Sequence, residues 1–525
     1  MTLHLHTAER TDALADGLAD LLVTPLADPF AREVVVVPAR GVERWLTQRL
    51  SHRLGVGARG GDGVCAGVDF VTPHSLVSML LDRDAEDPWS PDRLAWPLLE
   101  VVDEAMGSPG FDDLTRHLGG GDPDDDRSAR RYAVARRLAG LFSSYAVQRP
   151  QLVRDWRAGD DTDGAGGALD PDLRWQAELW RRLLVRVGSP APDLRHAATI
   201  DQLRGGADGL DLPGRLSLFG HTRLPVTEVE LLRALGEHRD VHLWLPQPSP
   251  VLWEALAPTA SDGPVARAED RSADLVGHPL LASLGRDSRE LRRTLGDLES
   301  QQHPASHADP ATLLGWLQSD LRANRAPDAD TLAARVRRPT DLSVQVHACH
   351  GTARQVDVLR EVLVGLLEDD PTLEPRDILV MCPDIETYAP LISAGFGLAD
   401  VAREDVGHPA HRLRVRLADR SPGATNPLLG VAADLVELAA GRMTATSVLD
   451  LAATEPVRAR FGFTDDHLER MARWVDQAAI RWGYDRDHRS AFGLDLDANT
   501  WLSGLQRVLL GAAMSGEGHR FVGGT

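Results

Sequence analysis

The feature that most constrains this fold is a strand–turn–helix pattern that recurs along the chain. Residues 34–37 are all valine, as a strand buried on both faces of a parallel sheet requires. The loop PARG follows, and then a helix whose apolar side chains form one stripe: Val42, Trp45, Leu46, Leu50 and Leu54. Strands at 3–6 and 68–71, each followed by a helix, repeat the unit. Repeated units of this kind predict an α/β fold with a parallel sheet.

A helical stretch interrupts the first α/β core. Residues 82–198 show no clear strand and are rich in Trp, Leu and Arg at helical spacing, with breakers rich in glycine and aspartate. The strand pattern resumes at 216–219, followed by a helix at 227–235 and an alternating strand at 241–245. Residues 82–198 are therefore interpreted as an all-helical insertion.

A second α/β unit follows two linkers rich in Pro, Ser and Asp, at 258–275 and 300–312. Its strands are expected at 342–348 (LSVQVHA) and 378–382 (ILVMC), around a helix at 352–367. Two α/β cores with helical insertions are the plan of superfamily-1 helicases, whose parallel sheets are P-loop NTPase-like; this inference concerns architecture alone. We predict four domains: 1–81 with 199–325 (1A-like α/β), 82–198 (1B-like helical), 335–425 (2A-like α/β) and 426–525 (the helical start of a 2B-like domain in a chain expected to be truncated).

Length and composition indicate a folded protein. The 525 residues are 43% hydrophobic and 26% charged. No apolar run is long enough to span a membrane, and MTLHLHTAERTDAL lacks the apolar region of a signal peptide. Cys65, Cys349 and Cys382 lie too far apart for a disulfide framework or a cysteine-rich zinc site. We expect a cytoplasmic protein with reduced thiols, no membrane association and no metal.

The chain contains no lysine, so all 57 residues of the Lys and Arg class are arginine. Coding bias in a GC-rich genome accounts for this exchange at solvated positions. The chemical consequence is strict, because a P-loop needs a lysine at the β- and γ-phosphates, and a catalytic lysine base needs an amine that can lose its proton. The sequence thus excludes a P-loop ATPase site of the usual kind and a nuclease site of the PD-(D/E)xK type.

The formal net charge of −21 argues against a uniformly basic, nonspecific nucleic-acid binder. It leaves room for an arginine-lined groove in an acidic body.

Three short motifs resemble cofactor or metal sites but do not meet the requirements of those sites. GVGARG (55–60) matches G-x-G-x-x-G but follows a helix, so a flexible loop is the better interpretation. DPDDD (122–126) resembles a calcium loop, yet Arg127 and Ala133 stand where its glycine and bidentate glutamate belong. HACH (347–350) has no second ligand pair nearby, which argues against zinc. Either a strand end or a loop that touches nucleic acid accounts for HACH.

The two positions at which a helicase binds ATP and Mg²⁺ hold residues that cannot bind them. The loop after the first strand, where a helicase has its P-loop, reads HTAERT, and the charge of Glu9 would repel a triphosphate. The strand at 216–219 ends in Phe219 instead of an acid that could hold Mg²⁺. We predict a degenerate ATP site at Thr7, Glu9, Arg10 and Phe219.

Arginine in the loops at strand ends is the remaining candidate chemistry. Arg40 and Arg44 flank the second strand–helix turn, beside Trp45. Arginine binds phosphate through paired N–H groups, and a cation at a helix start is best explained by an anion brought there. We assign Arg40 and Arg44 to DNA, and Trp45, which belongs to the apolar stripe, to the core.

Several long segments carry a family resemblance: VVVVPARGVERWLTQRLSHRLGV, LSLFGHTRLPVTEVELLRALGEHRDVHLWLP, HACHGTARQVDVL and DPTLEPRDILVM. They are spread over nearly the whole chain, which resembles the N-terminal half of the RecC family, the gamma chains of exodeoxyribonuclease V (RecBCD). The resemblance implies a catalytically inactive, helicase-like subunit that splits duplex DNA, channels the single strands and scans the 3′ strand for a Chi-like signal. Its setting would be double-strand-break repair by homologous recombination.

The resemblance also implies partners and site residues. RecB-like and RecD-like subunits of a heterotrimer would use ATP and Mg²⁺, this chain would hold no cofactor, and the family's nuclease-like C-terminal domain would lie beyond residue 525. Double-stranded ends and single strands would be the DNA bound. The candidate DNA contacts are Arg40, Arg44, Thr72, His74, Ser143, Ser144, Arg149, His350 and Arg354. Pro38, Ala39 and Arg40 replace a turn that is polar in the family, and Ser143 and Ser144 replace acidic or amide residues, so the framework carries over and the recognised DNA sequence does not.

Two other functions stay open. One is an active helicase or nuclease of the AddB type, which the missing lysine disfavours. The other is a scaffold that contacts partner proteins and no DNA, and salt-dependent binding to forked DNA would distinguish it.

Overall fold

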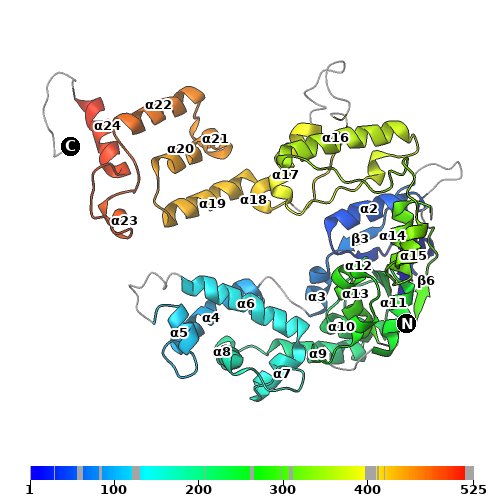
Figure 1. Ribbon diagram of the computed structural model, residues 1–525. Helices are drawn as coiled ribbons and strands as arrows, with labels where there is room; N and C mark the ends of the chain where they lie inside the picture. Colours follow the sequence, from blue (N-terminus) through cyan, green and yellow to red (C-terminus); the bar gives the residue numbers. More distant parts are fainter. Residues whose placement is uncertain are drawn as a thin grey trace. The chain divides into compact units, whose positions relative to one another are not determined.

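The structure is a computed structural model that describes residues 2–514, apart from 29, 56–62, 82–85, 121–129, 207–208, 260–264, 297, 307–310, 397–409, 411–412 and 419. The chain divides into two compact units, Met1–Val346 and His347–Thr525. Figure 1 shows the first in blue to green and the second in yellow to red.

A six-stranded parallel sheet is the centre of the first unit, in the order β3-β2-β4-β5-β1-β6. The strands are β1 (Leu3–Ala8), β2 (Glu33–Val36), β3 (Val68–Val71), β4 (Arg215–Phe219), β5 (Asp240–Pro246) and β6 (Ser300–Gln302). Val36 lies opposite Leu218, so β2 and β4 are neighbours although the helical insertion separates them in sequence. The loops after β2, β3 and β4 therefore leave the sheet side by side at one edge. The predicted α/β class with a parallel sheet is confirmed.

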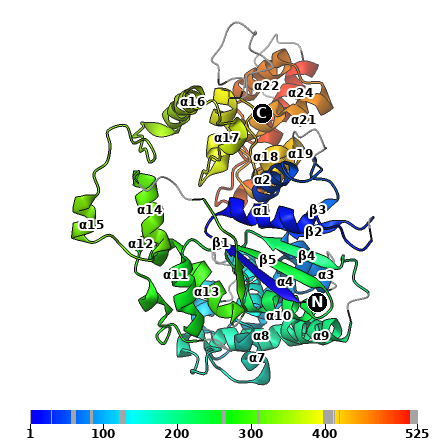
Figure 2. The ribbon, with the colours of Figure 1, turned by 90° about the vertical axis from the view of Figure 1, so that its right-hand side faces the viewer.

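Helices cover both faces of this sheet, and Figure 2 shows α1 (Thr11–Leu22) on one side of the strands and α10 (Val226–Gly236) on the other. With α2 (Arg40–Ser51), α1 buries an apolar cluster formed by Leu14, Leu18, Val35, Leu46, Leu50, Phe219 and Trp244. The opposite cluster joins α3 (Pro73–Leu80), α10 and α13 (Arg286–Leu295) to Leu5, Val36, Leu218 and Leu243. Val35 and Val36 thus face different cores, which is why this strand is apolar throughout.

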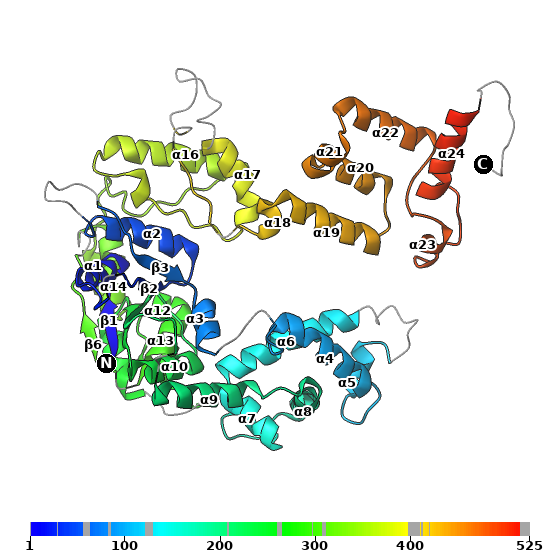
Figure 3. The same cartoon turned by 180° about the vertical axis from the view of Figure 1, so that it is seen from behind.

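The insertion is helical, as predicted, and its helices have a core of their own. The helices of this core are α4 (Pro91–Ala105), α5 (Asp112–His117), α6 (Arg130–Gln148), α7 (Pro150–Ala158) and α8 (Arg174–Val187). The next helix, α9 (Pro192–Gly205), instead packs Leu203 into a core cluster of the sheet. Figure 3 shows α4, α5, α6 and α8 gathered to one side of the sheet. Buried aromatic rings fill the core, and those of Phe142 and Trp180 meet edge to face with centroids 5.4 Å apart.

The rest of the first unit corrects one sequence expectation. Residues 300–312 were expected to be a linker, yet β6 pairs with β1 in parallel from Leu5 to Thr7. The strand has only three residues and reads Ser-Gln-Gln, so it carries no apolar signal, as is common for short edge strands. The remaining helices are α11 (Pro250–Leu256), α12 (Pro279–Leu284), α14 (Leu313–Arg322) and α15 (Ala329–Ala334).

The expected strands around HACH and ILVMC are wrong for this structure. Residues 342–348 and 378–382 form no ladder with any described strand, although the helix between them is present as α16 (Gly351–Asp369). Val346, Leu379 and Met381 are 94%, 83% and 87% exposed. The apolar pattern of a strand is present, but a strand also needs a neighbour that accepts its hydrogen bonds.

Helices make up the described part of the second unit. α16 and α17 (Ile385–Phe396) share a small core at Val356, Ile392 and Phe396. The others are α18 (Pro422–Thr425), α19 (Pro427–Ala440), α20 (Ala445–Ala453), α21 (Glu455–Phe461), α22 (Asp465–Gln477), α23 (Arg486–Ser490) and α24 (Trp501–Ala513). The helical character predicted from residue 426 onward is confirmed for the described residues 426–514.

A buried arginine organises the end of this unit. Arg489 is 2% exposed, and its guanidinium donates to the carbonyls of Trp482, Leu496, Ala498 and Asn499 at 2.7–3.1 Å. It also lies 4.6 Å from the centre of the Trp482 ring. Carbonyl oxygens and an aromatic face thus replace a carboxylate as partners of this cation.

Among the described residues, no helix is both long enough and apolar enough to cross a membrane.

Candidate nucleic-acid interface

Two of the predicted DNA-binding turns are neighbours at the carboxyl edge of the sheet. Arg40 is the first residue of α2 after β2, and Thr72 and His74 begin α3 after β3. The ladder between these strands continues to the edge, because Val37 N–H donates to the Val71 carbonyl at 3.0 Å. Ligands of open α/β sheets bind at this edge.

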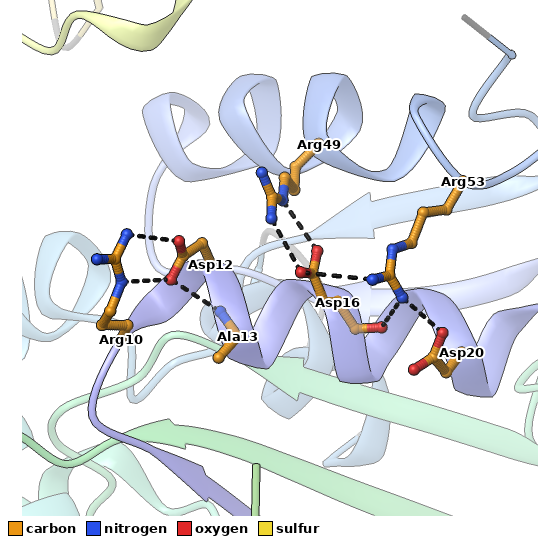
Figure 4. Close-up of polar contacts among 7 residues, drawn as sticks. All are labelled: Arg10, Asp12, Ala13, Asp16, Asp20, Arg49 and Arg53. Carbon is orange, nitrogen blue, oxygen red and sulfur yellow. Dashed lines mark hydrogen bonds and ion pairs between the residues drawn. The ribbon is translucent and has the colours of Figure 1, made fainter. Parts of the chain in front are cut away.

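Arg40 and Arg44 differ from the other two arginines of the same region. Both are exposed, lie one helical turn apart, and have no carboxylate partner among the described residues. Arg49 and Arg53 instead pair with carboxylates of α1 (Figure 4). Arg49 holds Asp16 through two contacts of 2.9 Å, and Arg53 reaches Asp20 at 2.7 Å.

Trp45 lies with the core side of α2, as expected. It is half-buried, and its ring centroid is 6.2 Å from that of the buried Phe219. Leu46 and Leu50 on the same side are fully buried. This packing orients α2 so that Arg40 and Arg44 face solvent.

Thr72 and His74 have different environments. The Thr72 hydroxyl accepts the Ser75 N–H at 3.2 Å and so caps α3, which gives this side chain a structural task. His74 is exposed. Of these two candidates, His74 has the freer side chain.

The predicted contacts in the insertion lie at the carboxyl end of α6. Ser144 and Arg149 are exposed, whereas Ser143 is half-buried and lines a small hollow with Trp89, Phe142 and Trp180. The loop after β4 is attached to this end of α6, because Thr227 donates to the Val147 carbonyl at 3.1 Å. The fold thus ties the insertion to the same sheet edge.

His350 and Arg354 belong to the second unit. His350 immediately precedes α16, Arg354 lies in its first turn, and both are exposed. Within the described part of the chain, no group of three or more His, Cys, Asp or Glu side chains could hold a metal ion, which includes the neighbourhood of HACH. GVGARG and DPDDD lie largely outside the described residues.

At the end of β1, internal contacts occupy the place of a P-loop. Asp12 accepts the Ala13 N–H at 2.9 Å in the first turn of α1 and holds the guanidinium of Arg10 at 2.7 and 2.9 Å. Glu9 faces Arg322 at 3.6 Å. Thr7 and Phe219 are fully buried. The protein's own carboxylate thus accepts one N–H group of the first turn of α1.

A buried histidine in the loop after β4 and a half-buried glutamate in the first turn of α10 are the titratable groups next to Arg223. Burial lowers the pKa of His221 to about 4 and raises the pKa of Glu228 to about 7. His221 is therefore neutral at pH 7 and Glu228 is only partly ionised. Neither group offers a full counter-charge to the arginines of this edge.

A chain of imidazoles lies on the α1 face of the sheet. His6 Nδ1 is 3.0 Å from His303 Nε2, and His6 Nε2 is 3.0 Å from His242 Nδ1. Burial and the neighbouring imidazoles lower the pKa of His6 to about 3, and burial lowers that of His242 to about 4. A neutral imidazole has one N–H donor and one acceptor nitrogen. His6 must therefore donate to one neighbouring imidazole and accept from the other.

Sequence reasoning missed Arg223, which lies in the loop after β4. Its position could have indicated it, because Arg223 closely follows the apolar strand 216–219 just as Arg40 closely follows the apolar strand 34–37. Arg223 is exposed, and its Nη2 donates to Gln148 Oε1 at 3.2 Å.

The sheet edge and the attached helices define an α/β chain with a built-in helical domain, and comparison with known proteins specifies the class. Residues 3–324 match the model described as "RecC, N-terminal domain", and residues 425–525 match "RecBCD enzyme subunit RecC fourth domain". The chain therefore belongs to the RecC family.

Three relatives illustrate the similarity. The RecBCD enzyme subunit RecC of Mycolicibacterium smegmatis is 56% identical over 535 residues, which cover 100% of this chain and 47% of the relative. The subunit of Mycobacterium tuberculosis (strain H37Rv) is 56% identical over 522 residues, or 98% and 46%. That of Escherichia coli (strain K12) is 30% identical over 564 residues, or 98% and 48%. The chain thus spans about half the length of these curated relatives.

Proposed function

We propose that this chain is the N-terminal part of a noncatalytic DNA-binding subunit of a RecBCD-type ATP-dependent helicase–exonuclease. It would act in the cytoplasm in double-strand-break repair by homologous recombination. There it would help to split the duplex, channel the single strands and scan the 3′ strand for a Chi-like signal. The names of its relatives support RecB-like and RecD-like partners.

The observation that supports the proposal most strongly is that some arginines at α2 pair with carboxylates while others stay exposed. Arg49 and Arg53 are paired with α1, whereas Arg40 and Arg44 are exposed at the sheet edge and have no carboxylate partner within the described ranges, in a chain of net charge −21. An exposed cation pair near a helix start is suited to phosphate, since the helix dipole and the cations attract the same anion. Single-stranded or forked DNA supplies phosphates at regular spacing.

We also propose that the chain binds no nucleotide and that partner subunits use ATP and Mg²⁺. The residues after β1 do not fit a triphosphate: the Asp12 carboxylate occupies an N–H of the first turn of α1, Glu9 adds negative charge, and the sequence has no lysine. This supports a degenerate ATP site at Thr7, Glu9, Arg10 and Phe219 in a superfamily-1 helicase-like fold.

The test separates this proposal from its two alternatives. The purified chain is expected to bind a fluorescein-labelled forked duplex with an affinity that falls steeply with salt, and to hydrolyse no ATP in the presence of that DNA. ATP turnover that persists through further purification would favour an active AddB-like subunit. Salt-independent or absent DNA binding, together with co-purification with RecB-like and RecD-like subunits, would favour a scaffold.

A further inference from the structure

Arg223 joins two parts of the interface that the sequence leaves far apart. Its loop follows β4, which is the sheet neighbour of β2. A Cβ atom added to Gly220 in this loop would lie 3.8 Å from Val42 Cγ1, in the first turn of α2. The loop after β4 therefore lies beside the helix that carries Arg40 and Arg44.

The same loop meets the end of the helical insertion. Arg223 Nη2 donates to Gln148 Oε1 at 3.2 Å, and Thr227 Oγ1 donates to the Val147 carbonyl at 3.1 Å. Gln148 is the last residue of α6 and directly precedes Arg149. The loop that carries Arg223 thus lies beside the start of α2 at Gly220 and is hydrogen-bonded to the carboxyl end of α6 through Arg223 and Thr227.

Most of the hydrogen-bonding capacity of Arg223 is unused. A guanidinium has five N–H donors, and among the described residues Arg223 has one hydrogen bond and no carboxylate partner. The only acidic residue in the first turn of the following helix is Glu228, whose burial raises its pKa to about 7. The side chain is exposed and keeps a positive charge that no full counter-charge in its loop offsets.

We infer that Arg223 is a further DNA-contacting residue, which binds a backbone phosphate between those held at Arg40 and Arg44 and those near Arg149. This inference rests on the proposed function, because it assigns one more cation to the same single-stranded path. The contact is to phosphate, since a guanidinium with free paired N–H groups matches two phosphate oxygens. Arg223 then contributes affinity and register and reads no base.

The experiment uses the whole chain, a fluorescein-labelled forked duplex and a salt series. Arg223→Ala is expected to weaken binding about threefold to tenfold and to make the slope of log affinity against log salt shallower by roughly one unit or less. Arg223→Lys, which keeps the charge, is expected to recover the slope. Arg204→Ala is the matched control, because Arg204 is exposed but pairs with Glu237 near the ends of α9 and α10.

A second variant separates phosphate binding from a structural role. Gln148→Leu removes the same internal hydrogen bond and leaves the cation, so it is expected to bind DNA within about twofold of wild type. If Gln148→Leu binds as weakly as Arg223→Ala, the arginine acts by holding the loop and the inference is wrong. If Arg40→Ala/Arg44→Ala weakens binding and Arg223→Ala does not, this inference alone fails. If the wild-type chain does not bind the fork, the proposed function fails as well.

Discussion

The guanidinium of Arg49 and the carboxylate of Asp16 meet in a two-pronged contact, with Nε–Oδ1 and Nη2–Oδ2 both at 2.9 Å. Asp16 lies on α1, between Asp12 and Asp20 at helical spacing, and each of the three carboxylates holds an arginine (Figure 4). Asp16 and Asp20 join α1 to Arg49 in α2 and to Arg53 just after it, whereas the partner of Asp12 is Arg10, which directly precedes α1. These ion pairs also separate the structural arginines of the region from Arg40 and Arg44, which are proposed to bind DNA.

Arg49→Ala is expected to lower the free energy of unfolding by about 0.5–1 kcal/mol, because the side chains of the pair are 40% and 29% exposed and water screens the interaction. DNA affinity should change less than about twofold, since this guanidinium is already occupied. Urea unfolding and fork binding of the same preparation measure the two effects. A large loss of DNA affinity at unchanged stability would show that Arg49 belongs to the interface.

His6→Phe should alter how the stability of the first unit depends on pH. In the folded state the pKa values of His6 and His242 are lowered to about 3 and 4, so these imidazoles stay neutral at pH values where the same groups of the unfolded chain, with a pKa near 6.5, become protonated. The stabilisation is complete above about pH 6.5 and is lost as the pH falls toward 4. Two acids lie near these imidazoles: Asp240 is 4.0 Å from His4, and the charge of Asp20 partly opposes burial, which lowers the pKa of His303.

The variant removes both imidazole bonds of His6, so at pH 7.5 we expect a loss of about 1–3 kcal/mol. Its stability should then fall less than that of wild type between pH 6.5 and 4.5. Denaturant titrations at several pH values measure both effects, with the exposed His74→Phe as control. An acid dependence identical to that of wild type would contradict the assignment of buried neutral imidazoles.

Glu228→Gln should give the opposite pH dependence. Burial raises the pKa of Glu228 to about 7, so ionising it in the folded state costs free energy that the unfolded chain does not pay. The wild-type protein therefore loses stability as the pH rises from about 4.5 to about 7, whereas the glutamine variant, which has no ionisable group here, does not. We expect the variant to be more stable by up to about 3 kcal/mol at pH 8 and nearly equal at pH 4.5.

Melting temperatures across this pH range measure the difference. Glu237→Gln is the control, because Glu237 is exposed just after the same helix. A Glu228→Gln variant that is less stable than wild type at pH 8 would show that the carboxylate is ionised and paired.

The sequence predicted the parallel sheet because its strands carry strong local signals. The all-valine run and the helix after it mark β2 and α2, and an alternating strand marks β5. β6 escaped prediction because Ser-Gln-Gln has no apolar pattern. The strands expected at 342–348 and 378–382 failed for the opposite reason, since an apolar pattern does not supply the neighbour on which a strand depends.

The candidate site was predictable only in part. Position after a strand was enough to select Arg40, but sequence could not show that Arg49 and Arg53 are paired with residues more than thirty positions away. Arg223 also follows a strand, and its loop shares an edge of the sheet with that of Arg40 only because β2 and β4 are neighbours across the helical insertion. Pairing between distant segments is a property of topology, which local patterns do not encode.

Binding of a forked duplex across a salt series tests most directly whether Arg40 and Arg44, exposed at the carboxyl edge of the sheet, bind DNA. Arg40→Ala/Arg44→Ala is expected to stay within about 0.5 kcal/mol of wild-type stability for each substitution, because both side chains are exposed. Each substitution should weaken binding and reduce the salt slope by about one unit or less, while Arg49→Ala leaves the slope unchanged. If the double variant binds like wild type at every salt concentration, Arg40 and Arg44 are solvated surface residues and the account is contradicted.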